Sequence, residues 1–351
     1  MNKLIISSSP HMRSPLTTQR IMMDVLIALL PTTVAAVVLF RLAALWLILV
    51  CCITALATEA LFQLAARREQ TITDGSALIT GLLVGLSLHA NVPLWQAAVG
   101  TVFAVAVVKL CFGGLGKNFA NPAITGRIFM LVAFAESAGG AYSHQLIEEF
   151  KVRYPITNKP PIPNYATVIP SMATPLNKIN DAGIGYLLCD ECKAAGKTFC
   201  PEFLLDMFLG RGLCGGAIGE VCSLALLIGF AYLLIRRVIS WHTPVTFIGT
   251  VFILSWILSG NLAYAVYYVF AGSLLIGAIF MATDYVTTPI NKAGKLVFGC
   301  GCGLITVLIR FYGAYPEGVS FAILFMNILT PYIEKWTKAR PLGAKRGGAR
   351  K

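Results

Sequence analysis

Charged residues are scarce in this chain. Lysine, arginine, aspartate and glutamate together make up 13% of its 351 residues, whereas apolar residues make up 57%. Soluble domains usually contain about a quarter charged residues. Together with a mean hydropathy of +0.74, this scarcity excludes an ordinary water-soluble globular domain.

The common catalytic motifs are missing as well. The sequence contains no Walker loop, no HExxH motif and no recognisable catalytic triad. The four histidines are scattered along the chain, so we assign no metal to them; they are His11, His89, His144 and His242. The polar N-terminus also lacks the short apolar core and cleavage site of a signal peptide, so we expect the first apolar segment to remain as an anchor.

Long apolar runs are abundant instead. Each run of about twenty residues can cross a bilayer of roughly 30 Å. Because backbone polar groups cannot stay unpaired in lipid, we expect these runs to form helices. The predicted spans are residues 21–40, 42–66, 76–92, 94–112, 122–137, 212–235, 244–260, 262–283, 295–311 and 316–334. The sequence therefore predicts an all-α polytopic membrane protein with about ten transmembrane helices.

One long polar segment divides the predicted spans into two groups of five. An odd number of spans in each half gives the halves opposite orientations, which is the inverted topology common in transporters. The predicted divisions are a cytoplasmic N-terminal segment (1–20), a first five-helix half (21–137), a long loop (138–211), a second five-helix half (212–334) and a basic tail (335–351).

The placement of lysine and arginine predicts the orientation. Most of the net charge of +12 lies on the side of the predicted termini, and the short loops opposite offer only Arg41 and Arg310. By the positive-inside rule, both termini are cytoplasmic and the long loop is extracytoplasmic. Because the basic residues lie at membrane edges and in the tail, anionic lipid headgroups are the expected partner rather than nucleic acid.

Three polar, glycine-rich segments interrupt the apolar pattern on the predicted cytoplasmic side. They are TDGSALITG (73–81), CFGGLGKNFANPAITGR (111–127) and FMATDYVTTPINKAGK (280–295). In the first, Asp74 precedes Gly75 and Ser76, an order that suits a helix N-terminus, where free N–H groups favour an oxygen ligand or an anion. Capped turns would explain each segment alone, whereas their shared side favours a common pocket.

Together with SPHMRSPLTTQRIM (9–22), these segments resemble the RnfD/NqrB family of respiratory membrane subunits over nearly the whole chain. The resemblance implies a urea-transporter-like fold of two inverted halves. It also implies an Rnf complex, a ferredoxin:NAD oxidoreductase that translocates Na⁺ or H⁺, with the A, B, C, E and G subunits of that complex as partners. NqrB proteins usually have a longer N-terminal extension than the roughly twenty residues before the first span here.

The long loop contains Ser171-Met172-Ala173-Thr174, followed by Pro175. This string resembles the S-G-A-T signature at which the family binds flavin mononucleotide (FMN) through a threonine hydroxyl. A phosphoester needs such a hydroxyl, the small Ala173 leaves it accessible, and Pro175 stiffens the chain after it. The resemblance therefore implies covalent FMN on Thr174, attached by a flavin transferase on the outer face.

The loop departs from the signature at two places. Met172 stands where the family usually has glycine, and Thr167 and Val168 stand where an aspartate is usual. A purely structural subunit whose loop has no flavin is therefore an alternative.

The resemblance further implies a second, non-covalent flavin, riboflavin in relatives, toward the cytoplasmic side. Its candidate contacts lie in the three polar segments. They are Asp74, Gly75, Ser76, Lys117, Asn118, Asn121, Thr283, Asp284, Thr287 and Thr288.

Ionisable residues within membrane spans are costly and are functional candidates by default. Those in the predicted spans are Asp24, Glu59, Lys109, Arg127 and Glu220, with Asp284 at a span end. Glu59 and Glu220 could line an ion path, or they could pair with Arg127 and hold helices together. Lys109 lies near a span end, so we expect it to extend to the membrane surface.

Cysteine is plentiful, and three cysteines in the loop have the spacing C-x2-C-x7-C. Cys189, Cys192 and Cys200 could form a disulfide, remain free thiols or bind a metal, although a full metal site would need a fourth ligand. The remaining cysteines are expected to be small apolar packing residues. They are Cys51, Cys52, Cys111, Cys214, Cys222, Cys300 and Cys302.

The sequence thus predicts a membrane electron-transfer subunit with no complete active site of its own. In such a subunit the flavin performs the chemistry, and the protein sets distance, potential and solvent access. The alternative from another class is an inverted-repeat transporter or channel for a small solute, without a redox role.

Overall fold

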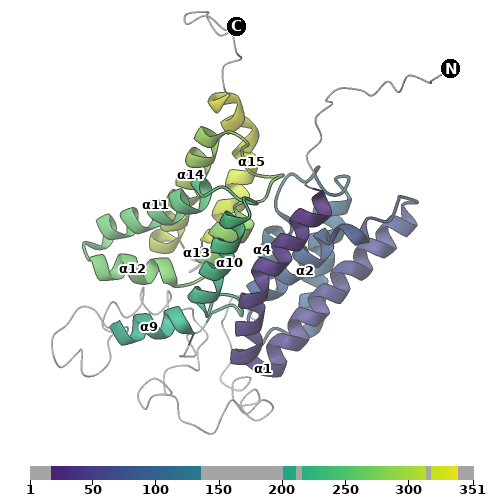
Figure 1. The fold of residues 1–351 in the computed structure, drawn as a ribbon, viewed down its shortest axis with the longest axis horizontal. Helices are drawn as coiled ribbons and strands as arrows, with labels where there is room; N and C mark the ends of the chain where they lie inside the picture. The colour runs from purple at the N-terminus through teal and green to yellow at the C-terminus, as the bar shows by residue number, and fades with distance from the viewer. Residues whose placement is uncertain (1–16, 136–200, 211–215, 314–317, 339–351) are drawn as a thin grey trace, which may run out of the picture.

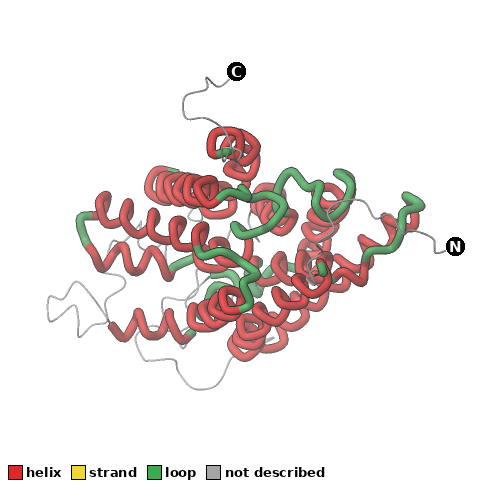
Figure 2. Tube along the Cα trace, turned by 45° about the horizontal axis from the view of Figure 1, so that its top comes forward, coloured by secondary structure: helices red, strands yellow, loops and turns green. Residues whose placement is uncertain are grey.

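The computed structural model describes residues 17–135, 201–210, 216–313 and 318–338. Within these ranges the regular structure is entirely helical, as Figure 2 shows. The predicted all-α class is therefore confirmed for this part of the chain. The predicted flavin site at Thr174, the three loop cysteines and Cys214 lie outside the described residues, as does the tail from residue 339.

Helix α1 (Thr18–Ala65) consists of two helices that meet at Arg41, where the backbone has φ 52° and ψ −132°. The side chain of Thr17 caps its start by accepting a hydrogen bond from the Arg20 amide at 3.3 Å. In Figure 1 the two arms of α1 run in opposite directions. The break lies between the predicted spans 21–40 and 42–66.

The rest of the first half consists of short elements. These are η1 (Ile72–Asp74), α2 (Ser76–Ser87), α3 (Leu94–Val102), the π-helix η2 (Phe103–Leu110) that continues α3, and α4 (Pro122–Ala133). Helix α2 begins directly after Gly75, whose φ of 77° favours glycine. Helix α4 begins with a proline in its first turn, where no backbone N–H is needed.

The second half begins after α9 (Pro201–Leu209), a helix within the predicted loop 138–211. It comprises α10 (Ser223–Ile235), α11 (His242–Ser259), α12 (Leu262–Phe270), α13 (Leu274–Ile276), the π-helix η4 (Gly277–Met281), α14 (Lys292–Tyr312) and α15 (Val319–Thr337). Helix α12 and the continuous α13–η4 pair meet at a bend of 65°. Gly272, with φ 71°, lies at this bend. The predicted span 262–283 is therefore broken.

Three helices of the described residues, α1, α11 and α14, are long and apolar enough to cross a membrane, and the bent pair makes a fourth if it is one span. Four shorter apolar segments are Ser76–Ser87, Leu94–Leu110, Pro122–Ala133 and Ser223–Ile235. The 12 residues of α2 rise only about 18 Å at roughly 1.5 Å per residue. The architecture is consistent with a membrane protein, while ten spans in two inverted halves stays a prediction.

Helices pack closely where one of them presents glycine. Gly81 of α2 lies against α1, where an added Cβ would come within 2.7 Å of the Cys51 carbonyl oxygen. Gly229 of α10 lies against α1 in the same way, with the Ala28 carbonyl oxygen as its nearest neighbour. Small residues at such crossings allow the backbones to approach, which drives helix association in lipid. A single core cluster includes residues of both halves, from Ala28 to Ile333.

We predict that Gly229→Ala destabilises the protein by about 1–3 kcal/mol, because the new methyl group overlaps the Ala28 carbonyl of α1. Gly249→Ala is the matched control, since Gly249 also lies in a helix but no atom beyond the neighbouring backbone of that helix lies within 4 Å of the added Cβ. Unfolding in mixed detergent micelles measures the free energy of unfolding of both variants. Equal stability of the two variants would contradict the close α1–α10 packing.

Candidate functional site

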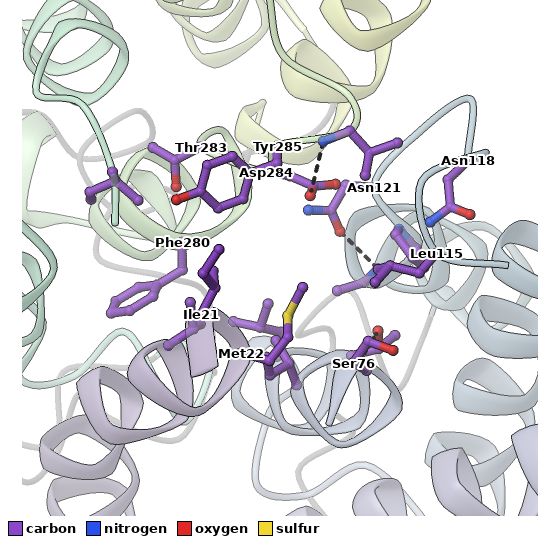
Figure 3. Close-up of a pocket in the computed structure, with 18 of the residues that line it drawn as sticks. Ile21, Met22, Ser76, Leu115, Asn118, Asn121, Phe280, Thr283, Asp284 and Tyr285 are labelled. Atoms are coloured by element: carbon purple, nitrogen blue, oxygen red, sulfur yellow. Dashed lines mark hydrogen bonds between the residues drawn. The ribbon is translucent and has the colours of Figure 1, made fainter. Parts of the chain in front are cut away.

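The three polar segments meet around one cavity of about 100 Å³. Ser76 belongs to the first segment, Asn118 and Asn121 to the second, and Thr283 and Asp284 to the third, and all five line the cavity (Figure 3). Apolar side chains from both halves form most of the remaining wall. They include Ile21, Met22 and Val25 of α1, Ile79 and Leu83 of α2, Leu233 of α10, and Ile279 and Phe280 of η4.

The other candidate contacts do not line this cavity. Asp74, Gly75, Lys117, Thr287 and Thr288 are absent from its wall. Some of them support wall residues through hydrogen bonds, as shown below. Binding of a cofactor at the cavity stays a prediction.

Asn121 joins the two halves beside the cavity. Its side-chain oxygen caps α4 by accepting hydrogen bonds from the amides of Ala123 (3.0 Å) and Ile124 (3.4 Å). Its side-chain nitrogen donates to the carbonyl of Met281, at the end of η4, at 3.1 Å. The residue thereby fixes the second polar segment against the third.

Asp284 is partly buried at the cavity wall and is held by its own turn. Its carboxylate accepts hydrogen bonds from the Val286 amide (3.4 Å) and the Thr287 hydroxyl (3.2 Å). The Thr288 hydroxyl donates to the Asp284 carbonyl. Burial raises the pKa of this carboxyl, and the hydrogen bonds from Val286 and Thr287 oppose that effect. Burial is the larger effect, so the pKa of the Asp284 carboxyl lies above its ordinary value.

A buried ion pair lies at the cavity wall. The Lys109 ammonium of η2 lies 3.0 Å from Oε1 of Glu59 in α1, and the two side chains are 2% and 1% exposed. The prediction that Lys109 extends to the membrane surface is wrong. The Lys109 ammonium donates hydrogen bonds to Glu59 and to the Ser76 hydroxyl, which lies 2.7 Å from Nζ. Because these acceptors lie inside the protein, the side chain does not extend to the surface.

A chain of hydrogen bonds extends from this pair toward the start of α2. The Ser76 hydroxyl accepts from Lys109 and donates to the Asp74 carboxylate at 2.7 Å, and the Ser76 amide donates to the same oxygen at 3.0 Å. On the other side, Glu59 Oε1 also accepts from Gln63 (3.3 Å) and from the Thr71 hydroxyl (3.1 Å). Asp74 thus acts through Ser76 rather than at the cavity wall.

A second buried ion pair links the two halves. Arg127 of α4 donates to Oε1 of Glu220 at 3.1 Å, and both side chains are less than 5% exposed. The Ala217 amide donates to the other carboxylate oxygen at 3.3 Å. The sequence left open whether Glu59 and Glu220 line an ion path or pair with Arg127. In the structure Glu220 pairs with Arg127, whereas Glu59 pairs with Lys109. An ion path through either residue stays a prediction.

Arg310 and Asp24 have partners that the sequence did not reveal. Arg310, counted above with the short loops, is buried in α14 and donates to the carbonyls of Tyr268 (2.6 Å) and Ala271 (3.2 Å). These carbonyls end α12 at the bend, where helical partners are lost, which explains the burial of the guanidinium. Asp24 pairs with Arg236 at 3.1 Å, joining α1 to the end of α10.

The described cysteines differ in burial. Cys51 and Cys302 are buried, and Cys52 and Cys222 are partly buried, as expected of packing residues. Cys111 and Cys300 are exposed, so that expectation is wrong for these two. Cys111 lies in the turn after η2, and for Cys300 the helix period alone does not say which face of α14 meets a neighbour. No group of three or more metal-ligating side chains occurs in the described part of the chain.

Comparison with known proteins identifies the family. The sequence model of the NQR2, RnfD, RnfE family matches residues 5–343. The chain belongs to the NQR2, RnfD, RnfE family. The pocket and the two buried ion pairs are therefore features of an NQR2, RnfD, RnfE family member.

Three similar proteins show how far the likeness extends. The D subunit of the Na(+)-translocating ferredoxin:NAD(+) oxidoreductase complex of Acetobacterium woodii is 40% identical, over 97% of this chain and 95% of its own. The D subunit of the proton-translocating ferredoxin:NAD(+) oxidoreductase complex of Clostridium ljungdahlii is 36% identical, over 98% of both chains. The D subunit of the ion-translocating oxidoreductase complex of Halorhodospira halophila is 33% identical, over 99% and 98%.

We predict that Arg127→Met lowers the free energy of unfolding by about 3–5 kcal/mol, because it leaves the Glu220 carboxylate buried without its counter-charge. The double variant Arg127→Met/Glu220→Gln should regain more than half of this loss. Arg236→Met is the control, since the Arg236 side chain is 40% exposed and its loss should cost less. Denaturation in mixed micelles measures the free energy of unfolding of each variant. A double variant no more stable than Arg127→Met would refute the pairing of Arg127 with Glu220.

Proposed function

We propose that this chain is the membrane-embedded D subunit of an ion-translocating ferredoxin:NAD⁺ oxidoreductase complex and relays electrons within it. The observation that supports this most strongly is full-length similarity to subunits of that name, at 40% and 36% identity. The partners are the A, B, C, E and G subunits of the Rnf complex and the surrounding lipid. The chain needs no acid–base constellation of its own, because a bound flavin supplies electron transfer.

The coupling ion is left open between sodium ions and protons. One similar protein is named for sodium ions and another for protons, and both align over almost the entire chain. Overall similarity therefore does not select the ion. Glu59 and Glu220 are the acids proposed to lie near its path.

We further propose that FMN is attached to Thr174 through a phosphoester, on the extracytoplasmic side. Its support is the string Ser171-Met172-Ala173-Thr174 before Pro175, in a chain of this family. A flavin transferase would make the bond, with the threonine hydroxyl as the nucleophile. The orientation rests on the distribution of lysine and arginine.

The second, non-covalent flavin is proposed to bind at the cavity between the halves. The wall offers an aromatic ring, Phe280, together with amide, hydroxyl and ammonium groups from Asn118, Ser76 and Lys109. Sites that bind cofactors combine an apolar wall with a few such polar groups. The cavity has a volume of about 100 Å³, and we propose that the polar edge of the flavin ring enters it while the rest of the ring extends beyond it. When bound, the flavin would accept and release electrons.

We predict that Thr174→Ala abolishes the ultraviolet fluorescence of the denatured chain in a gel, because the phosphoester is the only attachment that survives denaturation. Thr157→Ala, which lies in the same predicted loop but outside the signature, should stay fluorescent. Mass spectrometry of the loop peptide from the native host should show FMN on Thr174. An unmodified Thr174 there, or fluorescence that persists in Thr174→Ala, would refute the attachment.

A further inference from the structure

Lys109 is the one ammonium group among the residues that line the cavity. Its side chain is 2% exposed, and Nζ has two acceptors in the described structure, Glu59 Oε1 at 3.0 Å and Ser76 Oγ at 2.7 Å. An ammonium has three N–H groups. One donor therefore remains for a group inside the cavity.

The ammonium is held in a fixed position by both of its partners. Glu59 Oε1 accepts from Thr71 and Gln63 as well as from Lys109, so its carboxylate is tied to the end of α1 and the start of η1. Ser76 is fixed in turn by Asp74. A lysine side chain is otherwise flexible, and these contacts remove that freedom at the cavity wall.

A fixed positive charge is most effective where water is absent. Burying an ammonium is costly, and in other proteins the replacement of a buried ion pair by well-packed hydrophobic residues is often neutral or stabilising. Helix packing alone therefore does not account for a charge at the wall of a cavity. The same low dielectric strengthens its attraction for any negative charge placed in the cavity.

We propose that Lys109 binds an acceptor atom of the non-covalent flavin and stabilises the negative charge that the ring gains when an electron reaches it. The inference rests on the proposed flavin at this cavity and assigns Lys109 a role in setting its potential. A bound flavin would take up one electron from the preceding carrier of the complex and pass it to the next. Lys109 keeps its three protons, and no covalent bond forms or breaks. Glu59, Ser76 and Asp74 are positioning residues.

The test compares two double variants in the purified, intact complex. Lys109→Met/Glu59→Gln removes the charge at the cavity and leaves no uncompensated carboxylate. The matched control is Arg127→Met/Glu220→Gln, which removes an equally buried pair outside the cavity wall. Non-covalent flavin is quantified after acid precipitation, and its potential is measured by spectroelectrochemical titration, with the covalent flavin as an internal standard.

We expect Lys109→Met/Glu59→Gln to retain its flavin and to lower the equilibrium constant of one-electron reduction at least tenfold, a shift of about 59 mV. The control variant and the covalent flavin should not shift. Selective loss of non-covalent flavin from an assembled Lys109→Met/Glu59→Gln complex would also support the contact. If the variant retains its flavin and the equilibrium constant of one-electron reduction changes less than twofold, the role of Lys109 is overturned but the cavity site is not. A wild-type complex without non-covalent flavin would overturn the proposed cavity site as well.

Discussion

Buried charge constrains this structure more than any other interaction. An apolar core tolerates an ionised side chain only when a counter-charge and hydrogen bonds accompany it, so each such residue dictates which elements must meet. Glu59 and Lys109 join α1 to η2, and Arg127 and Glu220 join α4 to the segment before α10. The second pair crosses from one half to the other, and Asp24 with Arg236 does the same at the start of α1.

These links also fix the starts of two short helices. Helix α2 begins at Ser76, which is hydrogen-bonded to Asp74 and Lys109, and α4 begins directly after its cap Asn121, which is hydrogen-bonded to Met281. The cavity lies where these helix starts face the turn after η4 (Figure 3). Its polar groups are thus also the groups that fix the fold around it. A ligand placed there would contact both halves at once.

Local features of the sequence were readable because their causes are local. The break at Arg41 follows from the length of the apolar run, and the helix start after Gly75 follows from turn chemistry. The shared side of the three polar segments also favoured a common pocket. The bend at Gly272 was missed, because the apolar pattern continues through it.

Partners distant in sequence could not be read in the same way. Lys109 is near a helix end, which favours an exposed ammonium, and only the folded structure brings Glu59 to it from 50 positions away. Arg310 likewise donates to carbonyls that lack helical partners only because α12 ends at a bend. For Thr174 the situation is reversed: family resemblance supports its role, while its position is outside the described residues.

The proposed binding of a redox-active ring beside the Lys109 ammonium can be examined by electron cryomicroscopy of the intact, flavin-loaded complex. We expect density for a planar ring between Phe280 and Ser76, with a ring heteroatom about 3 Å from Lys109 Nζ. A cavity closed by side chains or filled by a lipid chain, with the non-covalent flavin elsewhere in the complex, would contradict it.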